Sequence, residues 1–531
     1  MPRARNTRFT FQPQTAWSRD LRRLDAHFSQ AEDRRLRYND RSRRLCGASG
    51  DLRLGLQLFH SRFAHLVACN RRGRPDGQRT PGRLVLPRWG VGGVTTGMSP
   101  NQAPLGPALP RERIQVLDAL RGFALFGILV INLYSFAGWF YLSPEERAFM
   151  TGPLDRMILR LDEVLVYGKF YTILSLLFGI GFSLQLQRGA DSDPALLGVY
   201  RRRLGILLGI GLLHIALLWQ GDILTLYALC GFLLIPFRRC SDRTLLRWAV
   251  VFILVPVGIS AAMILSGGRF DPGYPFFRVE DSLWARFFPP DTETLTVLGG
   301  RSWHEILKFN LAGVFDRFGD LFRDGRLFKV EAIFLVGLWA GRRLKDGRLL
   351  AQGATLRAVF IFGLAIGLPA SFVLNRVSEA NTAARFSAVG LLEAVLYVLA
   401  MAPLGLGYAA GFALLCRRMA WGRVLNFMAP AGRMALSNYL SQTLIGLSFY
   451  GVGFGIVGGV GPASMAVLAV LIFAGQVVVS SVWLRYFQFG PVEWAWRSLT
   501  YQRFLPLRLA SAGERRGDAL RGAAPAGPVT P

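Results

Sequence analysis

Apolar residues in this chain gather into continuous runs and do not alternate with polar ones. Between Leu117 and Phe487 the runs reach about 20 residues, which is long enough to cross the hydrocarbon core of a bilayer. A run without alternation is typical of a helix and not of a barrel strand. The pattern therefore predicts an all-α, polytopic membrane helix bundle with about ten transmembrane helices.

Ten segments meet this description, each flanked by more polar connections. The predicted spans are 117–139, 164–186, 203–220, 222–238, 247–266, 329–343, 355–374, 388–415, 430–456 and 464–485. The third and fourth spans are so close in the chain that they should form a tight hairpin around residues 219–222. The longest connection, 267–328, contains two Trp and a Pro289-Pro290 turn, which predicts interfacial helices outside the membrane.

Basic residues mark one side of the predicted membrane domain. Clusters of Arg and Lys occur in alternate connections, at 201–203, 238–247, 342–345 and 417–423, and again after residue 485. The intervening connections are poorer in Arg or mixed in charge. By the positive-inside rule the clusters face the cytoplasm. We therefore expect a multi-pass protein of the bacterial inner membrane with both termini cytoplasmic.

The two ends of the chain differ from the middle. Residues 1–97 hold 20 Arg and 7 acidic residues, no Lys and little apolar periodicity. We expect residues 1–110 to be a basic, disordered extension, with Met98 as an alternative start. Residues 111–503 should form the transmembrane domain and residues 504–531 a disordered cytoplasmic tail. The net charge of +28 lies mostly in residues 1–97 and in short loops, which argues against a nucleic-acid partner.

His214 lies deep in the third span and is one of only two His residues beyond residue 97. Asp222 follows at the start of the fourth span, and the hairpin can bring its carboxylate to the imidazole. A His that a carboxylate orients is the usual arrangement of a general base. The alternative is a buried His that bonds a backbone carbonyl. His214 and Asp222 are therefore the catalytic candidates.

Other polar residues at membrane depth are candidates for substrate binding. Asp118 and Arg121 share a face at the start of the first span, where they can form an anchoring salt bridge or an anion site for a phosphate. The deeper candidates, with helix packing or snorkelling as the alternative, are Asn132, Lys169, Tyr171, Asn438 and Gln442. The five cysteines suggest neither a disulfide framework nor metal-ligand spacing, so we expect no metal and no bound cofactor.

Four motifs, in order along the chain, make it resemble the bacterial YeiB-like membrane proteins, a family of unknown function. They are LDALRG (117–122), KFYTILSLLFGIG (169–181), LHIALLWQGDIL (213–224) and FGPVEWAWRSLTY (489–501). YeiB-like proteins are in turn similar to the transmembrane acyltransferase superfamily, which includes heparan-α-glucosaminide N-acetyltransferase. That similarity implies acyl-CoA as a co-substrate and an extracytoplasmic glycan or lipid as the acceptor.

The same similarity implies roles for particular residues. His214 matches the position of the catalytic base, and Asp118 and Arg121 match the motif at the entrance of the first helix. Attack on the thioester could be direct or could follow acylation of His214, with Asn132 or Tyr171 as donors to the oxyanion.

A secondary transporter or flippase of a small or lipid-linked substrate is the main alternative function. Such a protein would have two related halves with Gly- or Pro-broken helices. No internal repeat is evident, although the Gly-rich stretch 451–461 fits a broken helix. A non-catalytic membrane scaffold is a third interpretation. The sequence leaves the acceptor, the acyl length and the oligomeric state open.

Overall fold

In the computed structural model, which describes residues 114–187, 194–345, 352–380 and 387–509, every regular element is a helix. The α-helices are α3 (Gln115–Phe136), α4 (Pro144–Met150), α5 (Pro153–Leu161), α6 (Phe170–Leu186), α7 (Pro194–Leu217), α8 (Leu224–Leu234), α9 (Asp242–Leu265), α10 (Tyr274–Phe287), α11 (Thr294–Gly299), α12 (Trp303–Arg323), α13 (Arg326–Lys345), α15 (Gly353–Ala380), α16 (Ala388–Cys416), α17 (Met419–Leu425), α18 (Ala429–Arg433), α19 (Ala435–Leu447), α20 (Pro462–Tyr486) and α21 (Pro491–Tyr501). The predicted all-α class is thus confirmed for the described residues. The expected extension 1–110 lies outside them.

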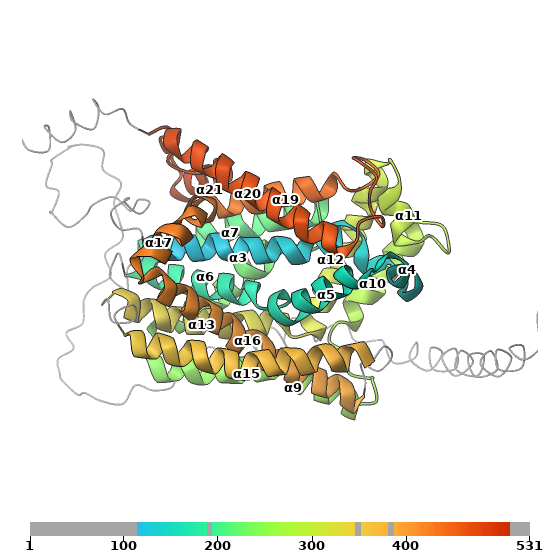
Figure 1. Ribbon diagram of the computed structural model, residues 1–531, viewed down its shortest axis with the longest axis horizontal. Helices are drawn as coiled ribbons and strands as arrows, with labels where there is room; N and C mark the ends of the chain where they lie inside the picture. Colours follow the sequence, from blue (N-terminus) through green and yellow to red (C-terminus); the bar gives the residue numbers. More distant parts are fainter. Residues whose placement is uncertain (1–113, 188–193, 346–351, 381–386, 510–531) are drawn as a thin grey trace, which may run out of the picture. The chain divides into compact units, whose positions relative to one another are not determined.

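Helix α3 occupies the middle of the bundle, where it contacts α6, α16, α18, α19 and α20. The long helices run side by side, with α13 between α6 and α9, and α15 against α16 (Figure 1). The short helices α17 and α21 lie near one end of the bundle, while α4, α10 and α11 lie near the other. The connections therefore gather at two opposite ends, as they do in a polytopic membrane protein.

Six helical segments of the described chain are long and apolar enough to cross a membrane. They are Gln115–Phe136, Pro153–Leu186, Asp242–Leu265, Gly353–Glu379, Ala388–Cys416 and Pro462–Tyr486. The other four predicted spans correspond to α7, α8, α13 and α19. Helices α8 and α19 have only 11 and 13 residues. Helices α7 and α13 carry Arg or Lys clusters that lower their mean hydropathy.

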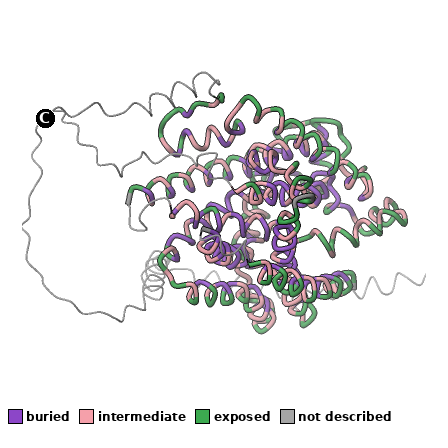
Figure 2. Tube along the Cα trace, turned by 60° about the vertical axis from the view of Figure 1, so that its left-hand side comes forward, coloured by how far each residue is buried: buried purple, intermediate pink, exposed green. Residues whose placement is uncertain are grey.

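Apolar side chains cover the outside of the bundle as well as its interior. Figure 2 shows exposed residues along the outward faces of the peripheral helices and buried residues inside. Large apolar residues with more than a third of their surface exposed include Val250, Val251 and Leu254 on α9, Ile361 and Phe362 on α15, and Val470, Leu471, Val478 and Val479 on α20. Soluble monomers rarely expose contiguous apolar patches of this extent. A lipid environment accounts for this surface.

Glycine allows α6 and α13 to approach each other closely. A Cβ built on Gly179 would lie 2.2 Å from the carbonyl oxygen of Phe334, and one on Gly337 would lie 2.4 Å from that of Leu176. Small residues at such a crossing let two backbones pack together within a membrane. Gly181, on the same helix, has nothing within 4 Å of its Cβ position. The close crossing therefore requires glycine at residue 179 but not at residue 181.

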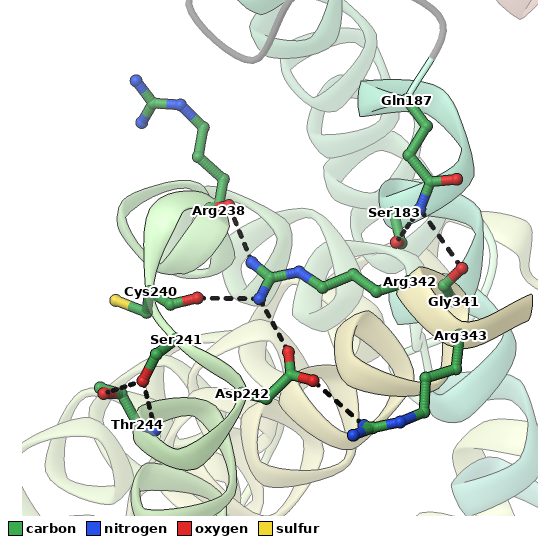
Figure 3. A network of polar contacts seen from close by, with 10 residues as sticks. All are labelled: Ser183, Gln187, Arg238, Cys240, Ser241, Asp242, Thr244, Gly341, Arg342 and Arg343. Atoms are coloured by element: carbon green, nitrogen blue, oxygen red, sulfur yellow. Dashed lines mark hydrogen bonds and ion pairs between the residues drawn. The ribbon is translucent and has the colours of Figure 1, made fainter. Parts of the chain in front are cut away.

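A polar network ties α13 to the connection between α8 and α9 (Figure 3). The Arg342 guanidinium donates to the backbone oxygens of Arg238 and Cys240, at 2.9 and 2.8 Å, and lies 3.1 Å from the Asp242 carboxylate. Arg343 approaches the other oxygen of that carboxylate, also at 3.1 Å. The basic cluster at 342–345 thus satisfies carbonyls that a helix end leaves without partners.

Two predicted boundaries differ from the structure. The ninth span, expected at 430–456, contains the break between α18 and α19 at Met434 and ends at Leu447. Residues 504–509, expected in a disordered tail, instead return along the end of α20, where Gln488 N donates to Leu507 O and Leu509 N donates to Tyr486 O. The Trp494 indole also donates to Leu505 O at 2.7 Å. Indole and backbone donors therefore hold this segment in place.

Candidate functional site

His214 and Asp222 meet in the interior of the bundle. The Nδ1 atom of His214 lies 3.1 Å from an Asp222 carboxylate oxygen, and the side chains are 1% and 0% exposed. They come from the last turn of α7 and from the connection before α8. A buried charge is costly unless it has partners, so this pairing places the carboxylate where it can stabilise a protonated imidazole.

The hairpin between α7 and α8 is held by backbone-directed bonds. The second Asp222 carboxylate oxygen accepts from Thr225 N at 2.6 Å, which caps the start of α8. From α12, Arg317 donates to Asp222 O at 2.8 Å and Asn310 donates to Leu218 O at 3.0 Å. One oxygen of the carboxylate therefore caps α8 while the other faces the imidazole, and α12 fixes the connection that carries Asp222.

Two side chains of α19 complete the surroundings of the imidazole. The Nε2 atom of His214 lies 2.9 Å from the Thr443 hydroxyl. One turn earlier on the same helix face, the Tyr439 ring packs with its centroid 5.4 Å from the imidazole centroid. When Nδ1, which faces the Asp222 carboxylate, carries the proton, Nε2 can accept a hydrogen bond from a hydroxyl. Carboxylate, imidazole and hydroxyl thus follow one another as in an activated-nucleophile site.

A cavity of about 410 Å³, here called cavity A, leads towards this pair from the end of the bundle that holds α21. Four arginines line it: Arg121, Arg203, Arg433 and Arg497. Further in, the lining is apolar and includes Leu125, Leu174, Leu177, Phe178, Leu204 and Leu207. Cavity A therefore combines a cationic entrance with an apolar interior.

The inner part of cavity A reaches Ile223 and Tyr439. Ile223 directly follows Asp222, and its backbone N–H donates to the Tyr439 hydroxyl at 3.3 Å. Because the Tyr439 ring also packs on His214, it stands between the cavity and the imidazole. Within the described chain the Tyr439 hydroxyl has no acceptor for its own proton, so it can donate to a ligand in the cavity.

Helix α21 covers the entrance of cavity A. The buried Glu493 carboxylate accepts from Leu436 N at 2.6 Å and Ser437 N at 3.1 Å, which are the first amides of α19. The Trp496 indole donates to Arg203 O at 2.9 Å, and the Arg203 guanidinium lies over the Trp496 ring. The helix is thus attached both to α19, which carries Tyr439 and Thr443, and to Arg203 of the entrance.

Asp118 and Arg121 form the expected pair, with the Arg121 guanidinium 2.8 Å from the carboxylate, and both line cavity A. The pair is therefore a salt bridge, and its position in the lining of cavity A is also compatible with an anion site. Asn132 lies on α3 and lines neither of the two cavities described here.

Four other candidates bond to groups other than His214. Asn438 donates to Ser480 Oγ, and Gln442 donates to Gln476 Oε1, so both bond to α20. Lys169 is 1% exposed and donates to Glu163 O at 2.9 Å. The Tyr171 hydroxyl lies 3.4 Å from the Tyr397 hydroxyl of α16. These contacts favour helix packing for Asn438 and Gln442, and they place the Tyr171 hydroxyl beside α16.

Thr443 and Glu493 contribute to the site but are not among the residues predicted from the sequence. Thr443 follows Tyr439 by four residues, so the two share a helix face. Glu493 occupies the first turn of α21, which begins after Gly490. Neither the spacing of Tyr439 and Thr443 nor the position of Glu493 in α21 shows which other helix each side chain contacts. Among the described residues, no group of three or more His, Cys, Asp or Glu is placed to hold a metal ion.

Comparison with known proteins shows that the chain is similar to a family without a named activity. Residues 345–503 match the family described as "Protein of unknown function (DUF418)". The uncharacterized protein YxaH of Bacillus subtilis is 31% identical over 423 residues, which cover 76% of this chain and 98% of the relative. The uncharacterized protein YeiB of Escherichia coli is 28% identical over 409 residues, which cover 73% of this chain and 96% of the relative.

Proposed function

Because the chain belongs to the YeiB-like (DUF418) family of unknown function, we propose from its own site that it is a membrane acyltransferase. It takes an acyl group from cytoplasmic acyl-CoA and transfers it to a hydroxyl or amine of an extracytoplasmic glycan or lipid. The observation that carries the proposal is cavity A, which begins among four arginines and ends beside the His214–Asp222 pair.

The proposed topology has ten membrane-spanning segments, with both termini in the cytoplasm of a bacterium and the bundle in its inner membrane. In this arrangement α8 with the following turn, α7, α13 and α19 cross the membrane beside the six more apolar segments. The entrance arginines and α21 then face the cytoplasm. This fits the positive-inside rule, since the Arg clusters share that side.

Cavity A matches the chemistry of acyl-CoA in two parts. Phosphates are bound by arginine because its planar, permanently charged guanidinium donates in a fork. Arg121 and Arg203 would take the phosphates of CoA, and the apolar interior would take the pantetheine arm and acyl chain. A thioester at the inner part of the cavity would then lie against Tyr439, next to His214.

In the proposed transfer step, His214 carries the proton from the acceptor to the CoA thiolate. The acceptor hydroxyl or amine replaces the Thr443 hydroxyl as the hydrogen-bond partner of His214 Nε2 and gives its proton to that atom as the acceptor oxygen or nitrogen bonds to the thioester carbon. Asp222 stabilises the imidazolium, and the Tyr439 hydroxyl donates to the carbonyl oxygen as its negative charge grows. The carbon–sulfur bond breaks, and the CoA thiolate receives the proton from His214.

The proposal predicts that Arg121→Ala weakens acyl-CoA binding by about tenfold or more, because a charge-assisted bond to a phosphate is lost. Binding is measured on purified protein in detergent with labelled acyl-CoA, and Arg203→Ala should act in the same direction. Arg301→Ala is the matched control, since Arg301 is exposed and lines neither cavity. Equal affinities for wild type and all three variants would rule out cavity A as the CoA site.

A transporter is the second candidate, and one observation favours it. A further cavity, described below, is lined by Ile131 and Tyr134 of α3, whereas cavity A is lined by Asp118 and Arg121 at the other end of that helix. Cavities at opposite ends of one helix suit alternating access. Uptake of a substrate into vesicles that persists when His214 is replaced would favour this function.

A further inference from the structure

A second cavity, cavity B, of about 470 Å³ lies between α3, α9, α13, α15 and α16. Ser371, Asn375 and Ser378 of α15 line it and share one helix face, while Phe372 and Val373 point away and are exposed. A polar stripe on a membrane helix marks a lined cavity, because polar groups at that depth are costly unless they have partners. Cavity B has no part in the acyl-transfer site.

Several charged groups of cavity B already have partners. Tyr134 donates to the Asp162 carboxylate at 2.6 Å, and Asn375 donates to the Glu163 carboxylate. The Arg323 guanidinium bonds the Asp271 carboxylate. These contacts are internal to the protein, so none of them calls for a ligand.

Two cations of α13, Lys329 and Arg326, also line cavity B. The Lys329 ammonium lies 4.4 Å from the centroid of the Tyr397 ring, and its residue is 6% exposed. Arg326 lies in electrostatic contact with Tyr397, Tyr167 and Tyr171. In the part of the chain that the structure describes, neither cation hydrogen-bonds or pairs with a carboxylate through its side chain, although Asp324 is near both. They lie one turn apart and line the same cavity.

A third group points to a ligand independently. Ser371 is 1% exposed and lines cavity B, yet its hydroxyl finds no hydrogen-bond partner among the described residues. On the α16 side, Glu393 lies one turn before Tyr397 and also lines the cavity. Cavity B is thus lined by two cations from α13, a hydroxyl donor from α15 and a carboxylate from α16, beside apolar residues such as Met263 and Leu374.

We propose that cavity B binds the headgroup of a zwitterionic phospholipid. The phosphate lies against Arg326, Lys329 and the Ser371 hydroxyl, and the ammonium faces Glu393. In the proposed topology the cavity lies in the outer half of the bundle. The inference rests on the lining of this cavity and holds whether the protein transfers acyl groups or transports a substrate.

The test is binding of short-chain phosphatidylethanolamine to purified, delipidated full-length protein in detergent, without acyl-CoA. Lys329→Gln and Arg326→Gln should each weaken binding about tenfold or more, because each removes a charge-assisted bond to the phosphate. Lys329→Arg should keep most of the affinity, which separates loss of charge from misfolding. Lys308→Gln on α12 is the matched control, since Lys308 lines neither cavity.

Two further probes identify the ligand. Short-chain phosphatidylglycerol, which lacks the ammonium, should bind more weakly than phosphatidylethanolamine, and Glu393→Gln should remove that preference. Inorganic phosphate should compete poorly. Unchanged phosphatidylethanolamine affinity in both α13 variants, equal binding of the two lipids to wild type, or competition by inorganic phosphate at the same concentration would each overturn the proposal.

Discussion

Replacing His214 by Gln is expected to lower acyl transfer by roughly 10²–10⁴-fold, the range that general acid–base catalysis contributes. Gln can keep a hydrogen bond to Thr443, but it cannot take a proton at the position of Nε2. Acyl-CoA affinity should change little, since His214 is not among the residues that line cavity A. The measurement is release of CoA thiol from acyl-CoA by purified protein reconstituted with bacterial membrane extract as the source of acceptor.

Asp222→Asn should also lower the rate, because the amide no longer stabilises the imidazolium. The double variant should be little slower than His214→Gln alone, since residues that act as a unit are not additive. His304→Gln is the matched control, because His304 is exposed on α12. Wild-type release in a folded His214→Gln protein would remove the imidazole from the mechanism.

Gly179→Ala is expected to destabilise the protein by roughly 1–3 kcal/mol, the usual cost of overpacking. The new methyl group would lie 2.2 Å from the Phe334 carbonyl oxygen, which is backbone and cannot rotate away. Gly181→Ala, two residues later, should be neutral or stabilising by up to about 1 kcal/mol, because Ala favours a helix over Gly. Thermal unfolding in detergent measures both variants.

This comparison isolates the crossing of α6 and α13, because helix propensity changes equally in the two variants. Equal melting temperatures would mean that α6 and α13 do not pack as closely as the structure has them. A lower melting temperature for Gly181→Ala alone would contradict the assignment of open space at that position.

Residues joined by a short connection were the most predictable part of the site. The short 219–222 hairpin keeps Asp222 close to His214, so their contact follows from the geometry of the chain. Asn438 and Gln442 share a face that the sequence indicates, but which helix that face meets depends on tertiary packing. The roles of Thr443 and Glu493 also depend on tertiary packing, since each side chain contacts a helix that is distant in the sequence.

The number of spans was less predictable than the helices themselves. Helix α7 starts before the Arg201–Arg203 cluster, and α13 ends in the Arg342 network, so basic residues are parts of these helices. Charge at a helix end lowers mean hydropathy without shortening the helix, which is why length and composition select only six segments. Likewise, the lining of cavity B comes from several helices, so no single stretch of sequence indicates it.

Photo-crosslinking with an acyl-CoA that carries a diazirine on its acyl chain locates the acyl group within the protein. We expect labelling of α8 and α19 near Ile223 and Tyr439, with the label lost when unlabelled CoA competes. Labelling confined to the lipid-facing surfaces of α9, α15 and α20, and unaffected by CoA, would contradict the claim that cavity A delivers a thioester to His214.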